Sequence, residues 1–472
     1  MMRNYITGLR PGGVVRVDTD ENQRGGSTKN FCHVGPNVIV NYRALEEFHF
    51  QRMTPIQFDF APVTGAVAYV DRSFLRRGSQ GWQRDLGVII PVHEHETWNQ
   101  STVVEALVDC LTFLTGDNWW FEFIPRTNLD EWLQHQQFLN LRTFQPSAVL
   151  PFSGGMDSWA VAQMIRLNDP SANLLLAQIQ NPSASILFDN DKSYNNSIKN
   201  IQSIRLPFKL RGIKKKEHTY RTRSFVFYGA AALASILSGY NQVVITENGQ
   251  GSLGPSLLPY AHEWPLRGAH PGFTTRLRRP IRALFDVDIK FDHHSLWKTK
   301  GQILKLIEKK SSIHNWEMTY SCTRYRPKLP ITSPRRDCGI CGNCLLTRVS
   351  LRAAGIEPPV GRYIWDDLKA KELSGALQSC AKRATNETDT AYAIHAIKDL
   401  ASLASFASNL SKEWSRLTAE ELSNDLNIDI DDLQVRIDGL VTQHAREWRE
   451  FVTALPADAW VRNVAEFWGV VE

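Results

Sequence analysis

The sequence predicts an α/β protein whose centre is a doubly wound, mostly parallel sheet, and three observations predict it. An apolar segment at 147–152 runs directly into a loop with two glycines and then into a helical pattern from Trp159 to Leu167. Further along, strand-like and helix-like segments alternate, which is typical of a parallel sheet covered on both faces. Four of the seven cysteines lie between residues 322 and 344, where they indicate a metal knuckle attached to this domain.

The length of 472 residues predicts two or three domains. We expect a β-rich N-terminal domain over 1–145, the central domain over 146–360 and a helical C-terminal domain over 361–472. A net charge of +5 is too small to indicate nucleic-acid binding by itself. The absence of a signal peptide and of an apolar run of membrane-spanning length predicts a cytoplasmic protein with no membrane partner.

The N-terminal domain is expected to contain strands at 66–71, 85–92 and 119–124, with a helix from Val103 to Leu114. The segment His93-Glu94-His95-Glu96 follows the second strand. Alternate residues of a strand share a face, so the two histidines could hold a metal, but no third ligand is evident. The interpretation that we favour is an ordinary polar strand end.

The loop Ser153-Gly154-Gly155-Met156-Asp157-Ser158 has the features of an anion site. The glycines let backbone N–H groups approach a ligand, and the following helix directs its positive end at the same place. Ser153 and Ser158 add hydroxyl donors, while Asp157 would hold a metal ion on the phosphates or support the loop. The alternative is a strand-to-helix turn in which Ser158 is an N-cap. The Gly-Lys-Ser/Thr ending of a Walker loop is missing.

Two later segments can extend this site. Arg223 and Ser224 precede the Ala-rich helix 225–238, where a guanidinium and free N–H groups could hold a phosphate together. Glu247 and Asn248 follow the strand 243–246, and ligands in parallel sheets gather at the carboxyl ends of strands. These two side chains could bind a purine edge or magnesium. A polar turn is the alternative.

The cysteine motif consists of Cys338-Gly339-Ile340-Cys341-Gly342-Asn343-Cys344 with Cys322 upstream. Cys-x-x-Cys knuckles let thiolates converge on one tetrahedral ion, and four thiolates close a structural zinc site. An iron–sulfur cluster on Cys338, Cys341 and Cys344 is the alternative. The isolated Cys32, Cys110 and Cys380 are expected to be buried thiols.

The C-terminal domain is expected to be helical. Residues 390–403 have apolar positions at helical spacing, and Thr418 with Glu421 has the pattern of a capping box. The apolar tail at 460–471 must pack on this chain or on a partner.

The Ser-Gly-Gly-x-Asp-Ser loop resembles the pyrophosphate-binding loop of ATP pyrophosphatases. Together with the cysteine motif it resembles the 7-cyano-7-deazaguanine synthase (QueC) family, whose Lys-Thr-Lys helix start is similar to Lys298-Thr299-Lys300 and whose Ser-Cys is similar to Ser321-Cys322. The resemblance covers about residues 146–360 and implies an adenine nucleotide alpha-hydrolase-like fold. This chain departs from the pattern by two terminal extensions and a basic insert at 324–336. The enlarged architecture is similar to the QueC-like proteins of anti-phage operons, of the QatC type of the Qat defence system.

The resemblance implies an ATP-dependent carbon–nitrogen ligase that uses Mg²⁺, adenylates a 7-deazaguanine-type carboxylate and transfers it to a nitrogen nucleophile. Asp157, Ser153 and Ser158 would be catalytic, and residues 153–158, Arg223, Ser224, Glu247 and Asn248 would bind the nucleotide. A protein encoded in the same operon could supply the accepting amine. Two alternatives stay open: a sulfur-inserting, tRNA-modifying ATP pyrophosphatase, and a non-catalytic nucleotide-binding scaffold.

Overall fold

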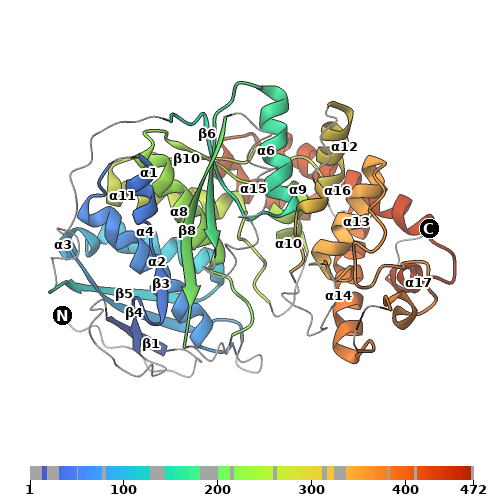
Figure 1. The fold of residues 1–472 in the computed structure, drawn as a ribbon, viewed down its shortest axis with the longest axis horizontal. Coiled ribbons are helices and arrows are strands. Elements are labelled where there is room, and N and C mark those ends of the chain that lie inside the picture. Colours follow the sequence, from blue (N-terminus) through green and yellow to red (C-terminus); the bar gives the residue numbers. More distant parts are fainter. Residues whose placement is uncertain are drawn as a thin grey trace. The chain divides into compact units, whose positions relative to one another are not determined.

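The computed structural model describes most of the chain, and Figure 1 shows its helices and strands. The described residues are 13–18, 31–49, 51–76, 81–127, 144–180, 200–212, 217–258, 263–310, 316–323, 336–379, 381, 383–408 and 412–468. The chain divides into two compact units, and each of them is discontinuous in sequence. Unit 1 comprises Met1–Ser153, Ser171–Ile245 and Tyr260–His293, and unit 2 comprises Gly154–Pro170, Thr246–Pro259 and His294–Glu472.

Unit 1 contains a six-stranded sheet in the order β10-β9-β6-β7-β8-β3. All neighbouring strands are parallel except β3, which pairs antiparallel with β8. The strands are β3 (Val38–Val40), β6 (Ala148–Pro151), β7 (Leu174–Gln180), β8 (Ile201–Leu210), β9 (Gln242–Val244) and β10 (Lys290–Asp292). Strand order reverses between β6 and β9, which defines a doubly wound sheet and confirms the predicted parallel α/β architecture.

The centre of this sheet is explained by its continuous apolar sequence. Every residue of β6 is buried, as expected for a strand covered on both faces. Val149 of β6 aligns with Leu175 on one side and with Val243 on the other. The Ala-rich α8 (Arg223–Leu237) packs beside β6, β7 and β9. The Ala-rich helix was predicted over 225–238.

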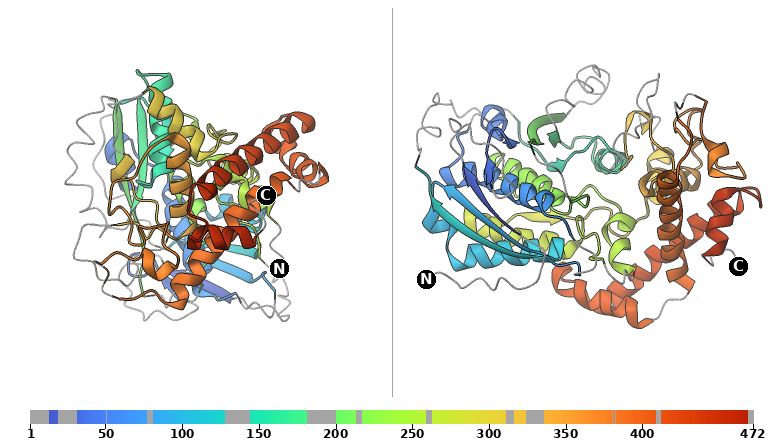
Figure 2. Two further views of the ribbon diagram at one scale, coloured as in Figure 1. Left: turned by 90° about the vertical axis from the view of Figure 1, so that its right-hand side faces the viewer. Right: turned by 90° about the horizontal axis from the view of Figure 1, so that it is seen from below.

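A second sheet in unit 1 has four parallel strands in the order β2-β1-β4-β5, visible as blue and cyan ribbons in Figure 2. The strands are β1 (Gly13–Asp18), β2 (Phe31–His33), β4 (Asp85–Val92) and β5 (Asn118–Pro125). The helices of this unit are α1 (Arg43–His49), α2 (Pro55–Ser73), α3 (His95–Trp98), α4 (Ser101–Thr115), α8 and α11 (Pro271–Phe285). The predicted strands 85–92 and 119–124 and the predicted helix 103–114 are confirmed.

The predicted strand 66–71 is wrong, because these residues belong to α2. A capping box between Thr54 and Gln57 and a proline at the first turn start this helix. All side chains from Asp59 to Asp71 are buried. A helix that is buried on every side has no polar stripe, so its sequence is indistinguishable from a buried strand. The expectation of a β-rich N-terminal part is corrected accordingly, since long helices accompany the sheet.

The His93–Glu96 segment does not form a strand with two histidines on one face. β4 ends at Val92, and His95 begins α3. His93 Nδ1 lies 2.7 Å from Asp59 Oδ1. Among the described residues, the group of side chains that could hold a metal ion includes neither His93 nor His95.

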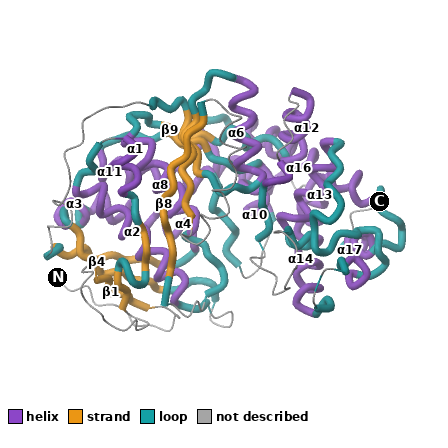
Figure 3. Tube along the Cα trace, in the orientation of Figure 1, coloured by secondary structure: helices purple, strands orange, loops and turns teal. Residues whose placement is uncertain are grey.

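Unit 2 is built from helices and loops, drawn purple and teal in Figure 3 from α12 onward. Its elements are α6 (Met156–Asn168), α9 (Gly249–Ser252), α10 (Gly254–Leu257), α12 (Lys300–Lys310), η3 (Trp316–Met318), α13 (Gly342–Ala354), η4 (Leu373–Ala376), α14 (Glu387–Ser408), α15 (Lys412–Leu426), α16 (Ile430–Thr453) and α17 (Trp460–Phe467). Among the helices in the described ranges, none has the length and apolar character needed to cross a bilayer.

The C-terminal helices of unit 2 agree with the predicted pattern at 390–403, which lies within α14. The predicted capping box at Thr418 is wrong, because this residue lies inside α15. Its hydroxyl donates to the carbonyl of Trp414 one turn earlier, which is the usual bond of a threonine within a helix. Val461 and Ala465 of the apolar tail are buried in the core of this unit.

We predict that acidification destabilises unit 1 through His270. Burial, assisted by Arg267, His293 and Arg276, lowers the pKa of His270 to about 3. The unfolded chain therefore binds this proton first, so stability is present above about pH 6.5 and is lost as the pH falls toward 3. His270 caps α11 by accepting from Gly272 N–H, a bond that asparagine can replace. His270→Asn should reduce the slope of unfolding free energy between pH 7 and 5 by up to about 1.4 kcal/mol per pH unit, measured by urea denaturation. An unchanged slope would contradict this assignment.

Candidate functional site

Two hydrogen bonds connect the glycine loop after β6 to Tyr320 and Ser321. Gly154 adopts φ 72°, the left-handed conformation that favours glycine. Gly155 is the N-cap residue of α6. Tyr320 N–H donates to the Gly154 carbonyl at 3.1 Å, and Met156 N–H donates to Ser321 Oγ at 2.9 Å. The first turn of α6 is thus fixed by a segment more than 150 residues away in sequence.

The serines of the loop differ in their surroundings. Ser153 is exposed and is the last residue of this segment of unit 1. Ser158 is buried, and its hydroxyl donates to the Gly155 carbonyl at 2.9 Å. A phosphate that accepted from Ser158 would have to replace this bond. The alternative prediction of Ser158 as an N-cap is wrong, because Gly155 occupies that position.

Asp157 is the meeting point of three helices in unit 2. Its Oδ1 accepts from Asn248 Nδ2 at 2.8 Å, and its Oδ2 lies 2.9 Å from Lys300 Nζ. The Lys300 side chain is 2% exposed and that of Asp157 is 19% exposed. A buried ammonium requires an anionic partner. The ion pair therefore ties the first turn of α6 to the first turn of α12.

Asn248 joins both acidic side chains. Its Nδ2 donates to Asp157 and also to Glu247 Oε1 at 2.9 Å, and its Oδ1 accepts from Gly251 N–H at 3.0 Å. The last bond makes Asn248 the N-cap of α9. Glu247 Oε1 also accepts from the Asn248 N–H at 3.0 Å. The predicted site residues Asp157, Glu247 and Asn248 are thus brought together in unit 2.

The electrostatic balance of this group leaves Glu247 easy to protonate. Burial and the negative charge of Asp157 raise the pKa of Glu247, and Lys300 and the Asn248 N–H oppose them with smaller effects. Two carboxylates next to one ammonium have an excess negative charge that a proton or a metal cation can neutralise. Carboxylate oxygens are the ligands that Mg²⁺ prefers, and the binding of this ion by Asp157 and Glu247 stays a prediction.

Lys300 was not identified as a site residue from the sequence. A signal for Lys300 exists, since Thr299 and Gln302 form a capping box by two reciprocal bonds of 3.0 and 3.1 Å. That pattern places Lys300 at the first helical position. Its pairing with Asp157 depends on the tertiary structure, which local spacing does not encode.

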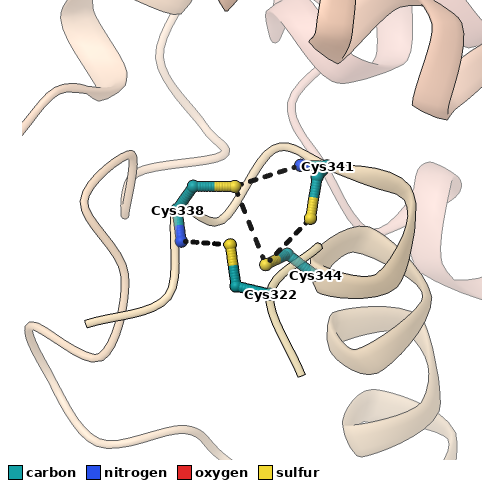
Figure 4. A group of neighbouring side chains, drawn as sticks. All are labelled: Cys322, Cys338, Cys341 and Cys344. Carbon is teal, nitrogen blue, oxygen red and sulfur yellow. Dashed lines mark hydrogen bonds between the residues drawn. The ribbon is translucent and has the colours of Figure 1, made fainter. Parts of the chain in front are cut away.

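The four predicted cysteine ligands converge in unit 2, as Figure 4 shows. The sulfur atoms of Cys322, Cys338, Cys341 and Cys344 all lie within 4.8 Å of one another, and all four residues are buried. Two of the separations are 3.8 Å (Cys338 to Cys344) and 3.4 Å (Cys341 to Cys344). Tetrahedral zinc with Zn–S bonds of about 2.3 Å requires sulfur atoms about 3.8 Å apart. The cluster therefore fits a metal ion such as zinc.

The knuckle around these sulfurs depends on glycine and on N–H donors. Ile340 and Cys341 N–H groups point at Cys338 Sγ at 3.5 and 3.4 Å. Gly339 has φ 90°, and a Cβ there would come within 2.4 Å of the Trp365 carbonyl oxygen. Hydrogen bonds from the other three thiols lower the pKa of the Cys341 thiol. Among the described residues this is the one group of three or more His, Cys, Asp or Glu side chains whose ligand atoms converge closely enough to hold a metal ion.

The remaining cysteines behave as predicted where the structure describes them. Cys32 and Cys110 are buried free thiols whose pKa is raised by burial. Cys380 and most of the insert, residues 324–335, lie outside the described residues.

Arg223 and Ser224 lie in unit 1 at the start of α8. Arg223 places its guanidinium over the Phe227 ring at 4.9 Å, and Ser224 Oγ packs against Gly268. The preceding Thr222 donates both its N–H and its hydroxyl to Asp71 Oδ2 at 3.0 Å. Asp71 thus supplies an anion at this helix terminus, and a phosphate there would compete with it. The nucleotide role of Arg223 and Ser224 stays a prediction.

No model of a protein family matches the chain, and no curated protein matches it either.

We predict that the purified protein contains about one zinc ion per chain, measured by inductively coupled plasma mass spectrometry. Cys341→Ser should lose the metal and lower stability, because a structural zinc site contributes directly to folding. Cys110→Ser is the matched control, since it removes a buried thiol from unit 1 and should keep the metal. Stoichiometric iron with visible absorption would instead indicate an iron–sulfur cluster.

We predict that Lys300→Met destabilises the protein by about 1–3 kcal/mol, because the Asp157 carboxylate loses its cationic partner next to Glu247. The exposed Lys305→Met on the same helix should change stability by less than about 0.5 kcal/mol. The double variant Lys300→Met/Asp157→Asn should regain part of the loss in chemical denaturation. Equal stability of Lys300→Met and the wild-type protein would contradict the importance of this ion pair.

Proposed function

We propose that this chain is an ATP-dependent carbon–nitrogen ligase that adenylates a 7-deazaguanine-type carboxylate and transfers it to a nitrogen nucleophile. The observation that carries the proposal is the group around Asp157. A glycine loop between a parallel strand and a helix is followed by an aspartate that is held by a buried lysine at 2.9 Å and by an asparagine at 2.8 Å. A second acid, Glu247, lies beside it.

Once a proton or a cation offsets the excess negative charge of Asp157 and Glu247, this group would suit a nucleotide polyphosphate. The first turn of α6 offers the positive end of a helix dipole, which stabilises anions. Lys300 supplies a full positive charge that is shielded from solvent, so its attraction for a phosphate is stronger than that of a surface lysine. Gly154 and Gly155 leave room for the loop backbone to approach phosphate oxygens.

Asp157 and Glu247 would hold a magnesium ion that accompanies ATP. When bound, this ion would supply neutralisation of charge on the leaving pyrophosphate. Because burial and Asp157 raise the pKa of Glu247, binding of this ion would release a proton from the pair. The asparagine amide keeps both carboxylates in place in the absence of the ion.

The chemistry proceeds in two displacements. A carboxylate oxygen of the substrate attacks the α-phosphorus, the bond to the bridging oxygen of the β-phosphate breaks, and pyrophosphate leaves with that electron pair. A nitrogen nucleophile then attacks the carbonyl carbon of the acyl-adenylate, AMP leaves, and the nitrogen loses a proton. The loop and Lys300 stabilise the negative charge that develops on the leaving phosphates.

We further propose that the accepting amine belongs to a partner protein of an anti-phage operon, as the enlarged QueC-like architecture suggests. The four converging cysteines support the ligase over a sulfur-inserting enzyme, because a fourth protein ligand closes the metal site. A closed site serves structure and leaves no position for a labile sulfur.

The proposal predicts that pyrophosphate and AMP are released from Mg·ATP when 7-carboxy-7-deazaguanine is present. Asp157→Ala should reduce this rate by at least about 100-fold, because the metal and the lysine lose their common anchor. A coupled pyrophosphate assay, with mass spectrometry of the products and of a co-expressed partner, provides the measurement. ATP binding with no pyrophosphate release in the presence of the acid would refute this substrate class.

A further inference from the structure

A chain of hydrogen bonds runs from Lys300 into the C-terminal helices. The Lys300 N–H donates to Gln250 Oε1 at 2.9 Å, and Gln250 Nε2 lies 2.7 Å from His444 Nδ1. His444 Nε2 lies 3.0 Å from the carbonyl oxygen of Leu400. The chain joins the starts of α9 and α12 to α16 and α14, all within unit 2.

The direction of each bond in this chain is determined. Gln250 Oε1 accepts from Lys300, so its Nε2 donates to His444 Nδ1. The Leu400 carbonyl can only accept, so His444 Nε2 carries the proton. This is the neutral imidazole, and burial lowers the pKa of His444 to about 4. Near neutral pH the imidazole therefore keeps one acceptor and one donor in fixed positions.

The short helix α9 is held closely between the segment before α12 and α16. Gly249 N–H donates to the Lys298 carbonyl at 2.9 Å. A Cβ at Gly249 would come within 2.1 Å of the Leu296 carbonyl oxygen and 2.8 Å of the Leu440 side chain. Asn248, which holds Asp157, is the N-cap of this same helix. A displacement of α16 would therefore move the partners of Asp157.

Helix α16 also contacts the start of α12 directly. Glu447, one turn after His444, is buried and accepts from the Thr299 hydroxyl at 2.6 Å. Its carboxylate packs against Gly301, where a Cβ would come within 2.8 Å. Thr299 and Gly301 flank Lys300, so α16 fixes the backbone on both sides of this lysine.

We propose that His444 is a positioning residue that places Lys300 and Asn248 around Asp157, and that the C-terminal helices are a working part of the site. The inference rests on the proposed function for its catalytic consequence. Its structural content, the placement of α9 and of the start of α12 by His444, stands independently and is testable without activity.

The test compares three variants of the full chain. His444→Leu removes both hydrogen bonds, while His444→Gln offers an amide with the same acceptor and donor. Val452→Ala is the matched control. Val452 is also buried on α16, but it belongs to a hydrophobic cluster other than the one that contains Leu440 and the residues next to α9. If His444→Leu does not fold, His444→Asn, whose shorter amide reaches at most one partner, takes its place.

Hydrogen exchange measured by mass spectrometry reports the placement directly. We expect His444→Leu to exchange at least about 10-fold faster in peptides that cover 247–258 and 297–304, with His444→Gln close to the wild-type protein. Val452→Ala should leave these two segments unchanged. Unaltered exchange there in His444→Leu, or an equal increase throughout α14, α15 and α16, would overturn the proposal.

Adenylation kinetics separate this proposal from the proposed function. We expect kcat for acid-dependent pyrophosphate release to fall about 10- to 100-fold in His444→Leu, with recovery in His444→Gln and no loss in Val452→Ala. Wild-type kcat in His444→Leu despite faster local exchange would overturn the positioning role. Faster local exchange in a protein whose wild-type form releases no pyrophosphate would refute the proposed function and support the placement by His444.

Discussion

The burial of one lysine next to two acids is the constraint on which the rest of unit 2 depends. Lys300 has lost nearly all contact with water, so the free energy of folding requires an anion within contact distance. Asp157 provides it, and Asn248 orients that carboxylate. The first residues of α6, α9 and α12 must therefore lie close together. Helices α9 and α12 are too short to be stable alone, so the long helices α14 and α16 are needed to keep these residues together.

A second connection joins the cysteine cluster to the glycine loop. Ser321 accepts from the first N–H of α6, and its neighbour Cys322 contributes a sulfur to the cluster. The glycine loop is thus hydrogen-bonded to residues 320–322, and the position of this segment depends on the cluster of four thiols. Because Ser321 and Cys322 are adjacent, a metal ion bound by the cluster would also restrain the residue that accepts from the first N–H of α6.

Features of the fold and the site that depend on local sequence could be predicted, and those that depend on contacts between distant segments could not. The limits of β4, the strand before the glycine loop and the convergence of the cysteines were predicted, because each depends on local pattern or on a spacing that a metal enforces. Residues 66–71 were assigned to a strand because a helix buried on all sides lacks a periodic signal. The roles of Lys300 and His444 were missed, since each is defined by a partner from a distant segment.

The discontinuity of unit 2 has a consequence for synthesis of the protein. Its segments start at Gly154, Thr246 and His294, and unit 1 contributes the chain between them. A nascent chain that carries Asp157 has no Lys300 to neutralise it and no α16 to hold α9. The group around Asp157 can therefore assemble only after α16 has been synthesised. This helix then packs against residues 246–259, which were synthesised much earlier. A chain that ends before Lys300 lacks the cation that pairs with Asp157, and one that ends before His444 lacks the partner of Gln250.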